Sequence, residues 1–305
     1  MRSAGSRRAV RGTAVKVQIV AVPYAHDVAK WGYAKGPEFH LRHGLIDTLK
    51  QHGHTVMDPV WANLPVSERT RDVVTNLGRL NQSESDLVLQ AFQDPETVVL
   101  ALQGDCTHAP GVAGGIYRKF GGVGMVWYDA HGDINTMATT ETGRWGGMPF
   151  AVALGWDLQD WREATGQAEP IPPRAAALFG TSDLDQAEKA AIQREGLIHL
   201  DARALNAEST RAALAPHRRN APAWYLHIDM DVAGPEAPGV NTPAPYWPER
   251  QALIDSCRAT GRTVPVVAFS IAAVNPDGDP EAKSARLGRD VAVAILEGIQ
   301  EARGL

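Results

Sequence analysis

The segment VWYDAHGDIN (residues 126–135) joins an apolar run to three polar residues, Asp129, His131 and Asp133, that stand at alternate positions. Successive side chains of a β-strand point to opposite faces, so these three would share a face wherever the chain stays extended. The segment therefore predicts a buried strand whose end presents a carboxylate, an imidazole and a second carboxylate on one side.

A second segment, HIDMDVAGP (residues 227–235), repeats the pattern with Asp229 and Asp231 after another apolar run. Carboxylates that gather without a counter-charge repel one another and are costly to bury. One or two divalent cations would remove that cost, and carboxylates with an added imidazole suit a metal such as Mn²⁺. The alternative for each acid alone is a helix cap or a loop residue, but two such clusters after two apolar runs favour a metal site.

The rest of the chain alternates short apolar runs with segments of helical spacing. Such alternation predicts an α/β protein with a parallel, doubly wound sheet, in which strands are covered on both faces. Long loops after parallel strands are where ligand sites form, and two follow expected strands, at 135–149 and 232–250. The expected strands are residues 17–24, 54–60, 97–105, 123–130, 176–183, 196–202, 223–232 and 264–276, and the expected helices are residues 37–53, 83–94, 111–121, 182–196 and 289–304.

Composition excludes several classes of protein. The 305 residues are 44% hydrophobic with a formal net charge of −5, which is ordinary for a globular protein and gives no basic nucleic-acid surface. No apolar run is long enough to span a membrane. Only two cysteines, Cys106 and Cys257, are present, which favours a reducing, cytoplasmic compartment over a disulfide framework. Residues 1–16 predict a flexible basic tail, with a basic interaction arm as the alternative.

From Gly32 to the last expected helix, the chain resembles the arginase–agmatinase ureohydrolase family. The segments DAHGDINT (129–136) and HIDMDVAGP match the two central metal motifs of that family and are specific in combination. Weaker matches flank them at residues 32–56, 103–112 and 272–276. The resemblance implies a single domain over residues 17–305, of three-layer α/β/α architecture with a mostly parallel eight-stranded sheet.

The resemblance also implies a set of metal ligands. Members of the family hold two Mn²⁺ ions that share a hydroxide, whose formation near neutral pH two cations promote. Asp129 and Asp229 would bridge the ions, and His131 and Asp231 would complete the shell of one of them. Asp133 would bind one ion and, as the catalytic residue, accept a hydrogen bond from the hydroxide.

The first departure from the family concerns the turn that supplies the first ligand. Cys106 stands where the family usually has a histidine, although some relatives, including a hydroxyarginine hydrolase, have a cysteine there. A thiolate suits Mn²⁺ less well than an imidazole does, so one site would be weak or another divalent metal would bind. His108 could replace the ligand or line the site, and its alternative is a surface residue at a helix start. The alternative for Cys106 is a small buried hydrophobe.

Two further departures concern the substrate. Gly146 stands where the family has a histidine that assists proton transfer, so any proton shuttle must come from elsewhere or from water. Ala273 stands where the family has a glutamate that pairs with the substrate guanidinium. Because a buried cation without a carboxylate partner is expensive, arginine and agmatine are expected to be poor substrates.

Further substrate contacts are expected from the resemblance and from the long loop. Asn135 would orient a substrate head group, or be a turn residue that bonds its own backbone. Asp185 falls where arginases contact the substrate amino group, or it is a charge at a helix N-terminus. Trp145 would wall the pocket, or anchor its loop.

These expectations converge on a metal-dependent hydrolase of a C–N bond in a guanidino-, amidine- or ureido-type small molecule. One alternative is a hydroxyguanidine hydrolase with an incomplete metal pair. The other is a non-catalytic relative that keeps the fold and binds a ligand or partner. The family commonly forms trimers or hexamers, so a homo-oligomer is expected, without a nucleic-acid or membrane partner.

Overall fold

The computed structural model describes residues 14–239 and 244–304. Within these ranges, nine strands form one sheet in which every pairing is parallel, and β2 and β3 form a separate antiparallel hairpin. The strands are β1 Lys16–Val22, β2 Tyr24–Ala25, β3 Val28–Ala29, β4 Thr55–Val56, β5 Val60–Trp61, β6 Thr97–Gln103, β7 Gly124–Tyr128, β8 Ala176–Thr181, β9 Ile198–Asp201, β10 Trp224–Asp229 and β11 Val266–Ala272. The predicted α/β fold is confirmed, with one strand more than expected because residues 54–60 contribute to two short strands, β4 and β5.

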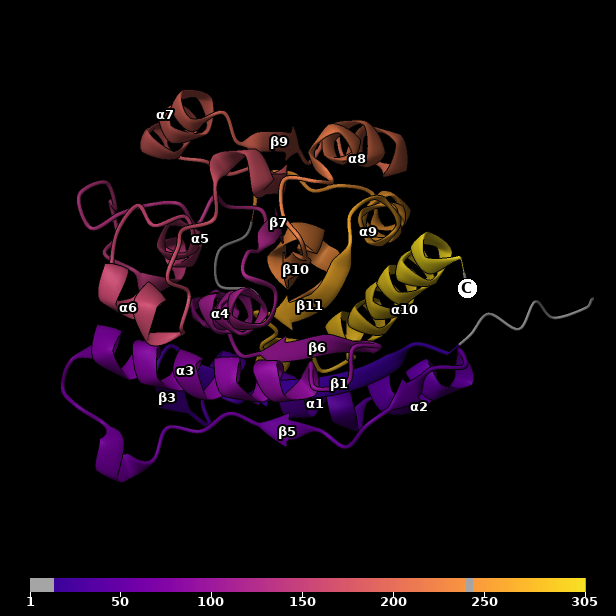
Figure 1. Cartoon of the computed structure of the whole chain (residues 1–305), viewed down its shortest axis with the longest axis horizontal. Coiled ribbons are helices and arrows are strands. Elements are labelled where there is room, and N and C mark those ends of the chain that lie inside the picture. Colours follow the sequence, from indigo (N-terminus) through magenta and orange to yellow (C-terminus); the bar gives the residue numbers. More distant parts are fainter. Residues whose placement is uncertain (1–13, 240–243, 305) are drawn as a thin grey trace, which may run out of the picture.

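Helices cover both faces of the sheet (Figure 1). Helices α9 and α10 pack together and lie on one side, with α2 against α10, whereas α3, α4 and α5 lie on the other side. The α-helices are α1 Gly36–Arg42, α2 Leu45–Gln51, α3 Val73–Ala91, α4 Ala109–Phe120, α5 Pro149–Ala153, α6 Gln159–Ala164, α7 Gln186–Glu195, α8 Ala207–Leu214, α9 Arg250–Thr263 and α10 Lys283–Arg303. The 3-10 helices are η1 Gly32–Lys35, η2 Val66–Glu68, η3 Cys106–His108, η4 Trp145–Gly147, η5 Pro173–Ala175, η6 Ala215–His217, η7 Met230–Glu236 and η8 Pro276–Gly278.

Some element boundaries differ from the expected ones. The helix expected over residues 37–53 is divided between α1 and α2, because Gly44 takes a left-handed conformation with φ of 82°. Glycine adopts that conformation without steric cost and so ends a helix readily. Helix α10 begins at Lys283, ahead of the expected residue 289, and α9 was not expected at all.

The sheet also begins earlier than the sequence predicts. Strand β1 starts at Lys16, and the preceding Val15 is only 1% exposed, so the ordered chain includes residues expected in the tail. Val15 is apolar and joins the main hydrophobic cluster, which explains the correction. The prediction of a flexible tail over residues 1–13 lies outside the described residues.

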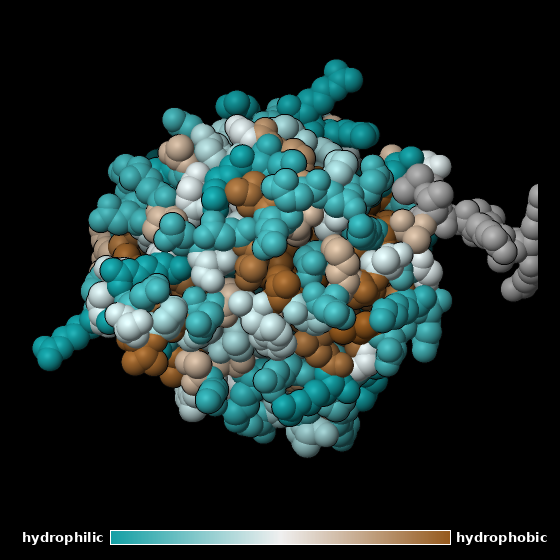
Figure 2. Space-filling view, turned by 60° about the horizontal axis from the view of Figure 1, so that its bottom comes forward, coloured by the Kyte–Doolittle hydropathy of each residue, from teal (hydrophilic) through white to brown (hydrophobic). Residues whose placement is uncertain are grey.

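The central strands of the sheet are almost entirely buried. Strands β6, β7, β8 and β10 are buried at every position, as expected for parallel strands between two helical layers. One face of the surface, shown in Figure 2, is mostly hydrophilic, with apolar residues in small groups between polar ones. Over residues 14–239 and 244–304, no helix combines the length and apolar character needed to cross a membrane.

The strand order brings the polar segments together. The order is β4-β1-β6-β11-β10-β7-β8-β9, so β6, β11, β10, β7 and β8 are successive neighbours. Because they are parallel, their carboxyl ends meet at one edge of the sheet, where ligand sites of such folds lie. The residues that follow these five strands therefore build one site.

Candidate metal centre

Two groups of potential metal ligands lie at this edge of the sheet. Cys106, Asp129 and Asp229 form one group, and Asp129, His131 and Asp231 form the other, and within each group the donor atoms lie within 4.8 Å of one another. Asp129 belongs to both groups, so its carboxylate is placed to serve two adjacent cations. The structure thus brings together five of the residues predicted to bind metal.

The end of β7 fixes the shared carboxylate. Asp129 Oδ1 accepts a hydrogen bond of 2.7 Å from the backbone N–H of His131, and Asp129 Oδ2 accepts one of 2.9 Å from Trp127 Nε1. Trp127 is fully buried and stacks on Phe150, so the indole that orients Asp129 is itself held by packing. These contacts at the end of β7 therefore fix the orientation of the Asp129 carboxylate.

The end of β10 and the turn after β6 complete the first group. Asp229 Oδ1 accepts a hydrogen bond of 2.8 Å from Asp231 N, and Asp229 Oδ2 accepts one of 2.8 Å from Cys106 Sγ. Cys106 begins η3, whose N-cap is Asp105. The cysteine is therefore oriented toward the ligand cluster, as a thiol that donates to a carboxylate.

In the second group, Asp231 after β10 contacts residues that follow β7. Asp231 Oδ1 accepts a hydrogen bond of 3.1 Å from Ala130 N, and Asp231 Oδ2 lies 3.0 Å from His131 Nδ1. His131 Nε2 is buried and has no hydrogen-bond partner among the described residues. Beyond the ends of the paired strands β7 and β10, the Asp231 side chain thus joins the two segments.

Asp133 reaches the site by a different backbone path from the one the alternation predicts. Its φ is 52°, so the extended conformation does not continue through all three alternate positions. The carbonyl of Asp133 accepts hydrogen bonds from Phe150 N and Ala151 N at the start of α5, which hold this unusual conformation. Asp133 belongs to neither three-donor group but lines the cavity above them, as strained residues at functional sites often do.

The charges of the cluster are unbalanced without a cation. Burial, followed by the charge of Asp231, raises the pKa of Asp129 to about 6. Burial and the charges of Asp231 and Asp129 raise the pKa of Asp229, and burial and the charge of Asp129 raise that of Asp133. Burial lowers the pKa of His131, but the hydrogen bonds and charges of Asp129 and Asp231 outweigh it and raise the pKa overall. Crowded oxygen donors with one imidazole fit divalent cations, which would neutralise this repulsion.

A cavity of about 760 Å³ opens above the ligand cluster. Asn135 and Asp185 both line it and contact each other, because Asn135 Nδ2 donates to Asp185 Oδ2 at 2.8 Å. Asp185 is also the N-cap of α7, which is the helix N-terminus alternative for this residue, and its contact with a substrate stays a prediction. The long loop over 135–149 contributes much of the wall, whereas no described residue of 232–250 does.

Glu188 is a residue of the cavity that sequence reasoning missed. Burial, followed by the charge of Asp185, raises the pKa of its carboxyl group to about 7. Glu188 is the third residue of α7 and forms a capping box with Asp185, a spacing that could have drawn attention to it. A Cβ at Gly132 would lie 2.5 Å from Glu188 Oε1, so a larger residue there would displace the Glu188 carboxyl group.

His108 and Trp145 lie elsewhere than expected. His108 is fully buried, with Nε2 at 2.9 Å from the carbonyl of Tyr24 and Nδ1 at 3.3 Å from Asn81 Nδ2, so neither ring nitrogen faces the cavity. This corrects both the expected ligand or substrate role and the surface alternative. Trp145 packs against the small apolar cluster that contains Trp161, which corresponds to the loop-anchor alternative.

The two positions that depart from the family motifs both line the cavity. Gly146 lies in η4, and a Cβ there would have only one neighbour within 4 Å, His26 Cε1 at 3.9 Å. Ala273 follows β11 with a φ of 61°, and its backbone N–H donates to the carbonyl of Gly104 at 3.1 Å. The cavity wall therefore carries no side chain at Gly146 and only a methyl group at Ala273.

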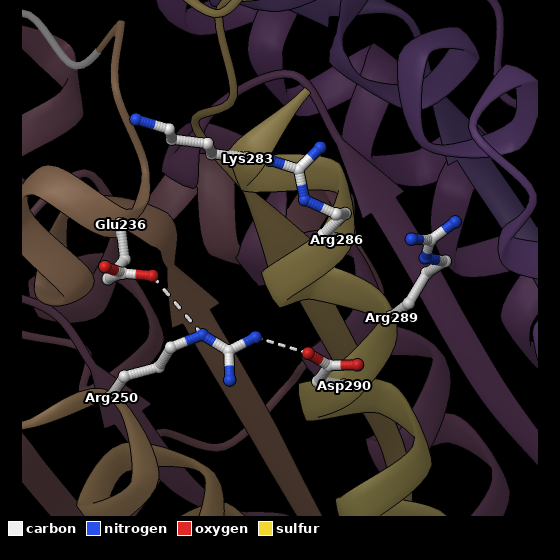
Figure 3. A pocket seen from close by; sticks show the side chains of 6 residues that line it. All are labelled: Glu236, Arg250, Lys283, Arg286, Arg289 and Asp290. Carbon is white, nitrogen blue, oxygen red and sulfur yellow. Dashed lines mark hydrogen bonds and ion pairs between the residues drawn. The ribbon is translucent and has the colours of Figure 1, made fainter. Parts of the chain in front are cut away.

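A second, smaller cavity of about 260 Å³ lies against the start of α10 and shares no lining residue with the first. Figure 3 shows Arg250 between Glu236 and Asp290, with an ion pair to each, while Lys283, Arg286 and Arg289 project from α10. The two carboxylates here already pair with an arginine. The cavity above the donor groups is therefore the candidate site.

Comparison with known proteins finds relatives that are similar in sequence and in fold. The chain is 28% identical over 242 residues to an arginase of Bacillus caldovelox, with 74% of this chain and 80% of the relative covered. The crystal structure of arginase from Bacillus subtilis superposes with a TM-score of 0.82 at 23% identity, covering 92% of this chain and 98% of the other. Proclavaminate amidino hydrolase from Streptomyces clavuligerus superposes with a TM-score of 0.72 at 19% identity, covering 95% and 93%. These two superpositions show a similarity of fold alone.

The family assignment rests on a match over most of the chain. The model of the arginase family matches residues 15–297, which include both donor groups and the lining of the cavity. The chain therefore belongs to the arginase family, whose members are hydrolases of C–N bonds other than peptide bonds.

Proposed function

We propose that this protein hydrolyses a C–N bond of a guanidino-, amidine- or ureido-type small molecule other than arginine, with two Mn²⁺ ions. The observation that carries the proposal is the buried carboxylate of Asp129, which belongs to two donor groups whose other members line the 760 Å³ cavity. When bound there, a pair of divalent cations would supply a nucleophilic hydroxide near neutral pH and polarise the substrate. Asp129, Asp229, His131, Asp231 and Cys106 would hold the pair.

The remaining groups of the cavity orient the substrate and manage protons. Asp133 faces the cavity above the ligands, where its carboxylate would accept a hydrogen bond from the attacking water. Glu188, whose pKa is about 7, can hold or release a proton near neutral pH. Asn135 and Asp185 form a hydrogen-bonded pair that would contact a polar head group, and an acid at 185 favours an amino group there.

The reacting group is proposed to be less basic than an unmodified guanidinium. Ala273 offers no carboxylate at the position where the family resemblance places one, and a buried cation would remain unpaired there. The names of the relatives span arginase and proclavaminate amidino hydrolase, so the family accommodates different compounds. Cys106 favours, as a second candidate, a hydroxyguanidine hydrolase with an incomplete metal pair.

The test is a release assay on purified protein loaded with Mn²⁺. Guanidino, amidine, hydroxyguanidine and ureido compounds are incubated in parallel, and ammonia, amine and urea are measured. We expect turnover of at least one compound, loss of turnover after chelation, and recovery when Mn²⁺ is returned. Stoichiometric metal binding with no turnover of any compound would instead favour the non-catalytic relative that binds a ligand.

The two cations are predicted to bind with unequal affinity. Cys106 supplies a soft sulfur ligand that suits Mn²⁺ less well than imidazole, and burial and the charge of Asp229 raise the pKa of its thiol. A metal must displace that proton, which weakens binding. Titration of metal-free protein should show two unequal events or one, and Cys106→His should tighten the weaker event, because imidazole suits Mn²⁺ better than a thiolate does.

Cys257 provides the control for this titration. It is also a buried thiol, but it lies in α9 and does not line the cavity, so Cys257→Ala should leave both affinities unchanged. Two equally tight Mn²⁺ sites in the wild type would contradict the prediction. A panel of other divalent metals in the same titration identifies the preferred ion.

Cellular location and oligomeric state form part of the proposed function. A cytoplasmic location is proposed from the two free cysteines, and a homo-oligomer, trimer or hexamer, from the family resemblance. Sedimentation of the metal-loaded protein tests the assembly.

A further inference from the structure

His26 is an imidazole in the cavity wall that the two donor groups do not use. It lies in the two-residue turn between β2 and β3, far in sequence from the metal motifs, and it lines the cavity. Its side chain is 42% exposed, so one side of the ring remains open. Imidazole is the side chain that ordinarily exchanges a proton between pH 5 and 8, so one that lines this cavity has the chemistry of a proton donor or acceptor.

Asp105 contacts the buried side of His26. His26 Nδ1 is buried and lies 3.1 Å from Asp105 Oδ2, a contact without hydrogen-bond geometry, whereas the backbone N–H of His26 donates a hydrogen bond to the same oxygen at 2.6 Å. Asp105 Oδ1 accepts hydrogen bonds from Thr107 N and Thr107 Oγ1 at the start of η3. A carboxylate beside one ring nitrogen limits the orientations of the ring, as it does in catalytic histidine–carboxylate pairs.

The turn that carries His26 is held rigidly. His26 has a φ of 50°, a left-handed conformation that histidine tolerates better than most residues. The next residue, Asp27, accepts hydrogen bonds from Asn76 Nδ2 at 2.7 Å and from Arg69 at 3.1 Å. On the other side, the buried His108 lies 2.9 Å from the carbonyl of Tyr24. Buried contacts on both sides therefore preorganise the ring.

The ring occupies space beside Gly146. A Cβ built at Gly146 would have one heavy atom within 4 Å, His26 Cε1 at 3.9 Å. An imidazole attached at 26 and a side chain attached at 146 would thus reach the same part of the cavity. Gly146 and His26 stand in different segments, so the same volume can be filled from either one.

We propose that His26, held by Asp105, is the catalytic residue that delivers a proton to the leaving nitrogen, which deepens the proposed function and rests on it. The oxygen of water forms a bond to the substrate carbon, and the C–N bond breaks with its electron pair going to nitrogen. That nitrogen takes a proton from the His26 imidazolium, and the imidazole then regains one from the water-derived hydroxyl. Overall one water is consumed, its oxygen goes to carbon, a proton goes to the amine, and His26 returns to its initial state.

The first test replaces His26 by asparagine, a residue that tolerates the left-handed backbone but carries no exchangeable ring proton. With the best substrate of the release panel, kcat should fall by about 10²-fold or more while KM changes little. Mn²⁺ content should remain that of the wild type, because His26 belongs to neither donor group. Added imidazole should restore part of the lost rate.

His52→Asn is the matched control. Its side chain is 46% exposed, close to the 42% of His26, and it also faces a carboxylate, Glu297 at 4.0 Å, but it does not line the cavity. Its kcat and KM should equal those of the wild type.

The second test moves the imidazole across the cavity. The double variant His26→Gly with Gly146→His vacates one position and fills the other, and glycine accepts the φ of 50° at 26. The kcat of the double variant should be at least about tenfold higher than that of His26→Gly alone. A purely structural role for His26 would not produce this gain.

The outcomes separate this inference from the proposed function. A wild type that hydrolyses panel compounds, with a kcat unchanged in His26→Asn, would overturn the role of His26 and leave the proposed function standing. A fall in kcat with loss of Mn²⁺ and no rescue by imidazole or by the double variant would also overturn it, because His26 would then be structural. A metal-loaded wild type that cleaves no compound would overturn both.

Discussion

Replacing Asp129 by alanine is expected to remove both cations and abolish hydrolysis. Asp129 is the one residue common to the two donor groups, so its loss takes a ligand from each. Changes to residues that merely orient metal ligands already cost about 10- to 100-fold in affinity or activity, so the loss of a shared ligand should cost more. Removing Asp129 also leaves Asp229 and Asp231 without the cations that balance their charge.

The change is measured by metal analysis and thermal unfolding. Cations that bind only the folded state stabilise it by about 2.7 kcal/mol at 100 times the dissociation constant. The rise in melting temperature that Mn²⁺ gives the wild type should therefore be absent in Asp129→Ala, while the protein stays folded. The same result is expected for Asp229→Ala, since Asp229 is also predicted to bridge. If Asp229→Ala kept one tight ion, Asp229 would belong to the Cys106 group alone.

Asp279 supplies the matched control for the loss of a buried carboxylate. Asp279 is buried and accepts hydrogen bonds from Lys283 N and Ser284 N at the start of α10, but it does not line the cavity. Asp279→Ala should lower the melting temperature and leave Mn²⁺ content intact. Full metal content in Asp129→Ala would show that the site has been assigned to the wrong residues.

Ala273→Glu is expected to shift preference toward guanidinium compounds such as arginine and agmatine. A carboxylate at the cavity wall would make a charge-assisted hydrogen bond to the flat cation, and its absence should cost about 2–5 kcal/mol where the cation is buried. That range corresponds to roughly 30-fold to several-thousand-fold in kcat/KM, at about 1.4 kcal/mol per decade. The φ of 61° adds no new strain, because alanine already carries a Cβ there.

The measurement compares kcat/KM for arginine and for the best neutral or less basic compound in wild type and variant. Ala282→Glu is a control for the cost of glutamate at such a position, because Ala282 has a φ of 55° and is 6% exposed, as Ala273 is, but lies outside the cavity. Efficient hydrolysis of arginine by the wild type would show that another residue supplies the missing charge.

Much of the ligand cluster was predictable from short-range pattern. Asp129 and His131, like Asp229 and Asp231, stand two residues apart at the end of apolar runs, and β7 and β10 turn out to be adjacent parallel strands. Cys106 was found through the family resemblance at the end of β6. The resemblance also placed Asn135 and Asp185 near the site, where they contact each other. Local pattern was less accurate for the boundaries of elements, because the break at Gly44 and the early start of α10 depend on local geometry and packing.

The sequence by itself determined the sheet and the group of acidic and imidazole side chains at its edge, because strand periodicity and apolar runs act over a few residues and parallel strand ends meet at one edge. Only the tertiary structure decided that His108 is buried beneath the site and that His26 and Glu188 belong to it. His26 and Asp105 are 79 residues apart in the chain, and no local pattern links a hairpin turn to the end of β6. Contacts of this kind arise when distant segments pack, since burial and charge are then set by neighbours that the local sequence does not contain.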